Sequence, residues 1–345
     1  MSAVAFTVER WTPAARLTIA ATVVLAVVAA LAPLWLGPGA MDRLTILFVY
    51  VILAAMWNAL AGYGGLVSVG QQVFFGLGAY FTIRLADAGI DPFVAMVAGA
   101  VIVGVIAVPL SFPMLQLRGG EFAIGMWVVA ELAHLLVNLD PLIRGETGTS
   151  LIALNAYDAP MRRNLIYWLA LVSVAGLLGG LFLLLRSRIG ASIQAIRDSE
   201  EAAASLGVEV TRTKRLIFVL AAFGAALAGA LWLATALTFQ PKAYFSVQWT
   251  AYMIFMVLVG GIGTFEGAII GAVIFFAIET WFGAAGIWYL VGLGAAALVF
   301  ALLLPRGIWG SVERRTGLRL LPVGYRLVVG ASPAAVRAAP LKETS

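Results

Sequence analysis

The chain has 345 residues, of which 62% are hydrophobic, 11% are charged and none is cysteine. Apolar runs of about 18 or more residues recur from end to end, which excludes a globular domain around one core and predicts an all-α polytopic membrane protein. The lack of cysteine excludes disulfides and thiolate metal sites, and a single histidine with scattered carboxylates argues against a membrane-embedded enzyme. The formal net charge is +5, but the basic residues cluster beside apolar runs, so membrane orientation explains them without nucleic acid.

Six apolar runs precede residue 186. They follow a polar lead, residues 1–16, and lie at about 17–36, 44–61, 62–84, 93–117, 118–138 and 165–185. The first run is expected to be a retained span, because it is long and lacks the small-residue cleavage motif of a signal peptide. The third run contains six glycines. Two interpretations of it stay open, a full crossing or a re-entrant segment.

Polar side chains inside this third run are candidates for a substrate pathway. Ser68, Gln71 and Gln72 interrupt a hydrophobic stretch, and polar groups that face lipid are costly, so they are expected to face a bundle interior. On a regular helix the two adjacent glutamines would point about 100° apart. A break in the helix near Gly70 and Gly76 would let both face one cavity. Close helix packing is the alternative role for the glycines.

A second polar group lies in run 118–138. Glu131 and His134 are three residues apart and so share one helix face. One interpretation is an ion or proton relay, which would make the chain an ion-coupled secondary transporter or channel. The other is a pair that braces two helices or lines a pathway. The chain contains no Walker pattern, so any ATP hydrolysis that drives it must occur in another chain.

The longest polar interruption is residues 186–215, RSRIGASIQAIRDSEEAAASLGVEVTRTKR. Its six basic residues lie close to the flanking apolar runs, which predicts a cytoplasmic position. The segment reads as helix, turn and helix, with Gly207 as a helix stop. Its apolar stripe consists of Ile193, Ile196, Ala202, Ala203, Ala204 and Leu206. A short amphipathic helix in this place suits docking into a groove of a partner protein, and an ordinary solvated loop is the alternative.

Four further apolar runs are expected between residues 216 and 304, and the tail 306–345 carries seven basic and two acidic residues. The consistent count is ten crossings, with a range of eight to ten, and both termini in the cytoplasm. The predicted organisation is a cytoplasmic lead (1–16), a transmembrane domain (17–305) that contains the loop 186–215, and a basic cytoplasmic tail (306–345).

Three ordered motifs carry a resemblance to a known family. They are Ala195-Ile196-Arg197 with Glu200-x-Ala202-Ala203 and Leu206-Gly207; Gly62-Tyr63, Gly65, Ser68, Gly70 and Phe74 to Tyr80; and Gly260-Gly261-x-Gly263-Thr264. In this order and spacing they resemble the branched-chain amino acid permease family of ABC importers, of the LivM type. Leu66 and Gln71 depart from the Gln and His that are usual in the family, which points to an unusual cargo.

The resemblance implies a permease subunit that forms the translocation pathway for branched-chain or related amino acids or small amides. It implies no catalytic residue, metal or cofactor in this chain, with ATP and Mg²⁺ in partner subunits. The implied partners are a sister permease, two ATP-binding subunits and a periplasmic or lipid-anchored binding protein, in the bacterial inner membrane. The residues implied to couple to the ATPase are Arg197, Glu200, Ala202, Ala203, Leu206 and Gly207. The residues expected along the substrate pathway are Ser68, Gln71, Gln72 and Glu131.

Overall fold

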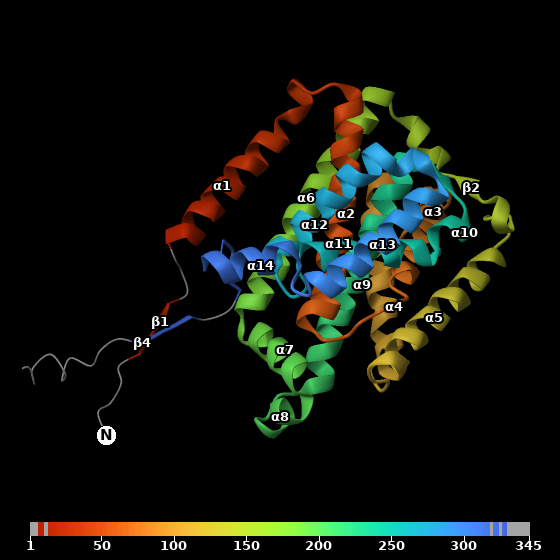
Figure 1. The fold of residues 1–345 in the computed structure, drawn as a ribbon. Helices are drawn as coiled ribbons and strands as arrows, with labels where there is room; N and C mark the ends of the chain where they lie inside the picture. The colour runs from red at the N-terminus through yellow and green to blue at the C-terminus, as the bar shows by residue number, and fades with distance from the viewer. Residues whose placement is uncertain (1–5, 10–12, 318–319, 324–325, 330–345) are drawn as a thin grey trace, which may run out of the picture.

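The computed structural model describes residues 6–9, 13–317, 320–323 and 326–329, and their arrangement is shown in Figure 1. The longer helices are α1 (Pro13–Ala30), α2 (Pro38–Asn58), α3 (Gln72–Asp87), α4 (Pro92–Met114), α5 (Gly120–Asn138), α6 (Ala159–Arg186), α7 (Arg188–Asp198), α9 (Val210–Ala236), α11 (Val247–Gly260), α12 (Phe265–Phe282), α13 (Ile287–Leu303) and α14 (Gly307–Thr316). The short helical elements are η1 (Ala32–Leu34), η2 (Ala59–Tyr63), η3 (Gly145–Thr147), η4 (Ile152–Ala156), α8 (Glu200–Ser205), α10 (Pro241–Tyr244) and η5 (Gly283–Ala285).

Strands are few in the described residues. They are β1 (Phe6–Glu9), β2 (Thr149–Ser150), β3 (Thr238–Phe239) and β4 (Arg326–Val329). β1 pairs with β4 in antiparallel register, so the first and last described segments lie side by side (Figure 1). β2 pairs with β3 and ties the loop after α5 to the segment after α9.

Nine helical segments of the described chain are long and apolar enough to cross a membrane. This confirms the predicted all-α polytopic class, and the number lies within the expected eight to ten. α3 does not reach that length, since it has 16 residues. The side of the membrane on which each terminus lies stays a prediction.

The segment 62–84 is broken, as one interpretation of its glycines required. α2 ends in the π-helical turn η2, residues 64–71 are not helical, and α3 begins at Gln72. Gly65 has a φ of +70°, which favours glycine at the start of the break. Because irregular backbone at membrane depth is tolerated where protein buries it, the break is expected to lie inside the bundle, and Ser68 and Gln71 there are 0% exposed.

α9 is the centre of the bundle and packs against α2, α3 and α4. Its alanines and glycines let neighbouring backbones approach closely. A Cβ at Gly229 would lie 1.9 Å from the Phe75 carbonyl oxygen, and a Cβ at Gly78 would lie 2.0 Å from that of Ala226. α3 and α9 are therefore in backbone contact, and larger residues at these two glycines would separate them.

The outer helices expose apolar side chains, as expected of surfaces that face lipid. Only 6% of the Leu17–Leu34 window is buried, against 78% of the Pro38–Tyr63 window. α1 lies apart from the main bundle in Figure 1. Its end is held by α6, because the Tyr167 hydroxyl donates to the Ala29 carbonyl (2.7 Å) and the Trp168 indole donates to that of Ala30 (3.1 Å).

Candidate functional site

The polar segment 186–215 forms two short helices at one end of the bundle, as expected from the sequence (Figure 1). Each helix has a serine cap: the Ser187 hydroxyl accepts from the Gly190 N–H (3.4 Å), and that of Ser199 accepts from the Ala202 N–H (3.3 Å). Gly207 follows α8 with a φ of +83°, which confirms the predicted helix stop. We call α7 and α8 together the coupling hairpin.

The apolar stripe of the coupling hairpin faces in two directions. Ile193, Ile196 and Ala203 are buried, with 1%, 4% and 2% of their surface exposed. Leu206 is 84% exposed, and Ala202 also lies on the surface. Part of the stripe therefore packs against this chain itself, which leaves the surface around Leu206 as the apolar part open to another protein.

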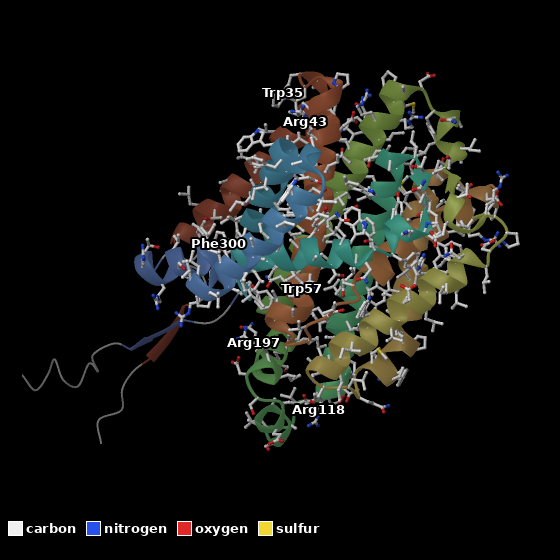
Figure 2. The ribbon with its side chains drawn as sticks, turned by 45° about the vertical axis from the view of Figure 1, so that its right-hand side comes forward. Trp35, Arg43, Trp57, Arg118, Arg197 and Phe300 are labelled. Atoms are coloured by element: carbon white, nitrogen blue, oxygen red, sulfur yellow. The ribbon has the colours of Figure 1, made fainter. Side chains whose placement is uncertain are left out.

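Arg197 turns its guanidinium toward the membrane helices. Its Nη1 donates to the Gly62 carbonyl at 3.0 Å, and its Nε donates to Asp198 at 3.0 Å. A Cβ at Gly65 would lie 3.4 Å from the Arg197 Cα, so the two backbones lie close together. Arg197 lies where α7 meets the bundle, below Trp57 of α2 in Figure 2. Its side chain thus connects the coupling hairpin to the end of α2.

Asn58 connects the same place to the turn between α11 and α12. Its Nδ2 donates to the Thr264 carbonyl (2.9 Å), and its Oδ1 accepts from the Gly263 N–H (2.8 Å). A Cβ at Gly62 would lie 2.1 Å from Asn58 Oδ1 and 2.6 Å from Gly263 N. The glycine motif of residues 62–80 and that of residues 260–264 therefore meet beside the hairpin. We call Asn58, Gly62, Arg197, Gly263 and Thr264 the coupling junction.

Glu200 and Lys214 fasten α8 to α9. Lys214 Nζ lies 2.6 Å from Glu200 Oε2, and the Lys214 side chain is only 12% exposed. At the next residue, Arg215 Nε donates to Ser111 Oγ of α4 (3.0 Å), and its guanidinium lies 4.1 Å from the centre of the Phe112 ring. The Glu200 carboxylate therefore pairs within this chain, and this ion pair connects the hairpin to the central helix α9.

Of the expected pathway residues, the structure buries three together. Ser68, Gln71 and Gln72 are 0%, 0% and 1% exposed. The Gln72 N–H donates to Thr250 Oγ1 (3.3 Å) and its Oε1 accepts from the Thr250 hydroxyl, so Gln72 holds α3 to α11. The Ser68 hydroxyl accepts from the Gly70 N–H (3.2 Å) and stabilises the break.

Gln71 differs from its neighbours. Neither polar atom of its side chain has a hydrogen-bond partner among the described residues, although both are buried. A buried primary amide without partners costs about 1–3 kcal/mol per unpaired group, so such a residue calls for an explanation.

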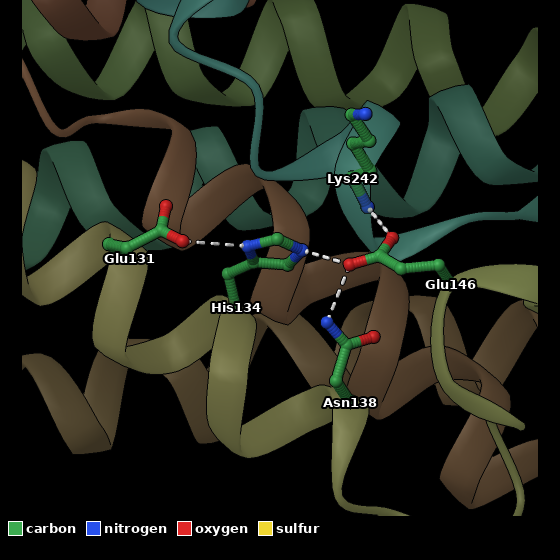
Figure 3. A network of polar contacts seen from close by, with 5 residues as sticks. All are labelled: Glu131, His134, Asn138, Glu146 and Lys242. Carbon is green, nitrogen blue, oxygen red and sulfur yellow. Dashed lines mark hydrogen bonds and ion pairs between the residues drawn. The ribbon is translucent and has the colours of Figure 1, made fainter.

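Glu131 is not in this buried group. Its side chain is 59% exposed, and its carboxylate contacts His134 Nδ1 at 3.2 Å. The other ring nitrogen of His134 lies 2.7 Å from Glu146, so the imidazole is held between two carboxylates, as Figure 3 shows. Phe245 stacks on the ring at a centroid distance of 5.8 Å.

Glu146 is the centre of this group of polar residues, which we call the Glu146 network, and the sequence did not predict its role. Besides His134, it accepts from Asn138 Nδ2 (2.6 Å) and from the Lys242 backbone N–H (2.9 Å), which joins α5, η3 and α10 (Figure 3). Burial alone would raise the pKa of the Glu146 carboxyl, but the hydrogen bonds from Asn138, Lys242 and His134 outweigh it and hold the pKa below its usual value. No local sequence pattern predicts the contact with Lys242, because Lys242 is 96 residues away from Glu146.

A polytopic helical bundle with a partly buried helix break, a buried unpaired amide in it and an amphipathic hairpin at its end is typical of membrane transport proteins. A sequence model of the family described as "Branched-chain amino acid transport system / permease component" matches residues 40–304, and the chain belongs to this family. The family predicted from the three motifs is thereby confirmed.

Two curated relatives carry the same description, "High-affinity branched-chain amino acid transport system permease protein LivM". The one from Salmonella typhimurium is 26% identical over 311 residues, which cover 82% of this chain and 73% of the relative. The one from Escherichia coli is 26% identical over 313 residues, which cover 83% and 73%. The chain is accordingly a transport permease and not an enzyme, and it is a multi-pass protein of the bacterial inner membrane.

Proposed function

We propose that this chain is the membrane subunit of an ABC importer for branched-chain or related amino acids or small amides. It forms the translocation pathway with a sister permease and receives mechanical work from two separate ATP-binding subunits, where ATP and Mg²⁺ reside. A periplasmic or lipid-anchored binding protein delivers the cargo. The family and the names of the two relatives support the transport of such amino acids.

The observation that carries the proposal is the attachment of the coupling hairpin to the bundle. Arg197 binds the Gly62 carbonyl, and Asn58 binds the turn of Gly263 and Thr264. A displacement of α7 therefore acts directly on the ends of α2, α11 and α12. A solvated loop with no mechanical role would need none of these contacts.

The expected coupling residues divide between two tasks. Leu206 and Ala202 present apolar surface to the ATP-binding subunit, and Gly207 lets the chain turn beneath them. Arg197, Glu200 and Ala203 transmit the movement inward, because their side chains contact this chain. Binding and coupling are thus carried by different residues of one hairpin.

The movement reaches the pathway through the central helix. Glu200 and Lys214 join α8 to α9, and α9 is in backbone contact with α3 just after the break. ATP binding in the partner subunits shifts the population between inward-open and outward-open states by favouring one position of the hairpin. Gln71 and Ser68 are fully buried in the state described, and a change of state exposes the Gln71 amide, which then donates to and accepts from the cargo.

The exposed face of α5 is evidence that a sister permease packs against this chain. Glu131 lies on it among Trp127, Val128 and Leu135, which are 52%, 60% and 55% exposed. A carboxylate on an apolar span is costly if lipid covers it, so a protein partner or a hydrated pathway is expected on this face. Glu131 then lines the pathway between two permeases, some distance from Gln71.

The alternative of an ion-coupled transporter gives Glu131 and His134 the central role. In the structure the Glu146 carboxylate holds His134 from the other side, and the same carboxylate fastens η3 and α10. Glu131, His134 and Glu146 therefore brace the loop after α5, which explains the pairing of Glu131 with His134 without ion coupling.

Co-purification with an ATP-binding subunit encoded beside this chain tests the proposal. Leu206→Asp is expected to abolish the association because it places a charge on the docking surface. Ile152→Asp is the matched control, since Ile152 is 70% exposed but lies in η4, far from the hairpin in sequence. Full association of Leu206→Asp, together with normal uptake, would contradict docking through this surface.

A further inference from the structure

A cavity of about 540 Å³ lies at the C-terminal end of α3, near β2 and on the far side of the bundle from the coupling hairpin in Figure 1. The last turn of α3, the loop after α5, β2 and η4 form its walls. Ligand cavities usually measure about 300–1,000 Å³, so a molecule of the size of an amino acid fits here. The cavity is separate from the helix break, because the 16 residues of α3 put about 24 Å between Gln72 and Asp87.

Two side chains of opposite charge line this cavity, Asp87 from α3 and Arg144 from the loop after α5. Neither has an ion pair or a side-chain hydrogen bond among the described residues, and the two do not pair with each other. The neighbouring charges of Arg84 and Asp140, in contrast, lie 3.4 Å apart. An anion and a cation that line one cavity and stay apart leave space for a molecule that carries both charges.

The backbone of Arg144 is fixed from both sides. Ile143 before it is 0% exposed, and the Asp140 carboxylate accepts from the Leu142 N–H at 3.0 Å. On the other side, Glu146 fastens the loop to α10 through the Lys242 N–H. Arg144 itself has a φ of +58°, a left-handed conformation that persists in residues other than glycine where the surroundings enforce it, and that is enriched at functional sites. The loop therefore presents Arg144 to the cavity from a fixed backbone.

The remaining walls of the cavity are mostly apolar. Ile83 and Leu151 are each 3% exposed and Ala86 is 9% exposed, so these three form the floor. Leu142 and Ile152 extend the apolar surface toward the rim. An apolar floor between two opposite charges matches an aliphatic amino acid, whose ammonium and carboxylate groups lie at one end of a hydrocarbon side chain. A neutral amide offers neither charge.

We propose that this cavity is an entry site for a zwitterionic aliphatic amino acid. The ammonium group contacts the Asp87 carboxylate, where the C-terminal end of α3 adds partial negative charge. The Arg144 guanidinium binds the carboxylate of the amino acid, and the aliphatic side chain lies on Ile83. The inference rests on the proposed function and narrows it, because it assigns amino acids and not small amides as the cargo. Asp87 and Arg144 are exposed, so water screens their charges, and binding is weak enough for the cargo to move on.

Binding of L-leucine to the full chain in lipid nanodiscs tests the charge requirement. Saturation-transfer NMR at constant ionic strength is expected to show saturable binding in the millimolar range. Isocaproate lacks the ammonium group, isoamylamine lacks the carboxylate and isocaproamide carries no charge, so each should bind at least tenfold more weakly. Equal affinity for isocaproamide would overturn the proposal, and so would an absence of L-leucine binding.

Asp87→Asn tests the contact with the ammonium group. The variant should weaken L-leucine binding but not isocaproate binding, so that the two affinities converge to within twofold. Its Tm should not change, because the carboxylate has no partner among the described residues to lose. Asp158→Asn is the matched control, since Asp158 is exposed, makes no side-chain cap bond to α6 and does not line the cavity. Retained preference for L-leucine over isocaproate in Asp87→Asn would overturn the assignment.

Arg144→Asn tests the contact with the carboxylate. Asparagine tolerates a positive φ, so the loop should keep its conformation and the Tm should hold. L-leucine and isocaproate should both bind at least fivefold more weakly, and isoamylamine should bind as before. Arg118→Asn removes an exposed positive charge outside the cavity and should leave all three affinities unchanged. An equal loss of isoamylamine binding in Arg144→Asn would show a disturbed loop and overturn the role of the charge.

A protein partner could also use the two unpaired charges, and the same variants distinguish it. If Asp87→Asn and Arg144→Asn kept L-leucine affinity but weakened association with the binding protein, the cavity would be a docking surface and the entry site would be overturned. Co-purification with the ATP-binding subunit reports on the proposed function independently. Its retention in an unmodified chain that does not bind L-leucine would overturn this site alone.

Discussion

The two polar centres of the molecule, the coupling junction and the Glu146 network, are held together by different kinds of interaction. The junction joins helices through an amide side chain, a guanidinium and backbone carbonyls, packed against glycines with no space for a Cβ. The Glu146 network joins them through charged side chains, and Glu131 and Glu146 are 59% and 48% exposed. The junction, which we propose transmits force, is tightly packed, and its amide and guanidinium do not titrate near neutral pH. The Glu146 network, which fastens a loop, depends on ionisation.

The largest effect is expected from filling the junction. Gly62→Val would place carbon atoms within 3 Å of Asn58 Oδ1 and Gly263 N, so the turn of residues 261–264 must move away from α2. Overpacking of this kind costs about 1–3 kcal/mol, and the lost bonds of Asn58 add to it. Uptake in proteoliposomes should be lost and the Tm should fall.

Gly176→Val on α6 is the control for that variant, because a Cβ at Gly176 meets nothing within 4 Å. It should retain uptake and Tm close to those of the unmodified chain. If Gly62→Val also retained normal uptake, the close contact at the junction would not be the route of coupling.

The next effect separates docking from coupling. Arg197→Gln removes a charge-assisted hydrogen bond to the Gly62 carbonyl, worth about 1.5–3 kcal/mol, but leaves Leu206 on the surface. The ATP-binding subunit should still co-purify and hydrolyse ATP, while uptake per ATP falls at least tenfold.

Arg212→Gln serves as the comparison for Arg197→Gln, since the Arg212 side chain is 84% exposed and pairs only with nearby Glu209 among the described residues. Its uptake per ATP should not change. A loss of ATPase association in Arg197→Gln would instead assign this arginine to the docking surface.

A third prediction contrasts the adjacent glutamines. Gln72→Leu removes the acceptor of the buried Thr250 hydroxyl, although the backbone N–H contact to Thr250 remains, and should lower stability by about 1–3 kcal/mol, seen as a lower Tm. Gln71→Leu removes an amide without partners, so Tm should hold or rise while uptake of the native cargo falls. Normal uptake in Gln71→Leu would remove this residue from the pathway.

The smallest effect is expected in the outer network. Because the pKa of Glu146 is lowered in the folded state, its ionised form stabilises the loop above the ordinary carboxyl pKa, and that stabilisation is lost as the pH falls through the lowered value. The hydrogen-exchange protection factors of residues 145–150, which correct for the slower intrinsic exchange in acid, should therefore fall as the pH is lowered. The change is modest, since water screens a side chain that is 48% exposed.

Glu146→Gln should show low protection factors for residues 145–150 at all pH values, because the amide cannot supply the same charge to His134. The coupling junction offers the internal control, and exchange of residues 58–65 should not follow this pH dependence. A parallel response at both places would show a global transition and not a local one.

The amino-acid sequence alone was sufficient to predict the family, the position of the coupling hairpin and the apolar runs that become the nine long helices. These follow from local features: apolar runs of membrane length, a polar stretch between two of them, and motifs whose residues lie close together along the chain. Gly207 as a helix stop is of the same kind, since a positive φ is a property of one residue and its neighbours. A break near Gly70 and Gly76 was one of the interpretations left open, and the structure places it at residues 64–71, with Gly76 inside α3.

The contacts of the polar residues could not be predicted in this way, because they depend on how distant segments pack together. Asn58 meets Gly263 across 205 residues, Arg197 meets Gly62 across 135, and Glu146 meets Lys242 across 96. Periodicity gives the face of a helix on which a side chain lies, but not which distant segment covers that face. For this reason Arg197 and Glu200 carry inward contacts that no local pattern indicates, and Gln71 differs from Gln72 although the two are adjacent and chemically identical.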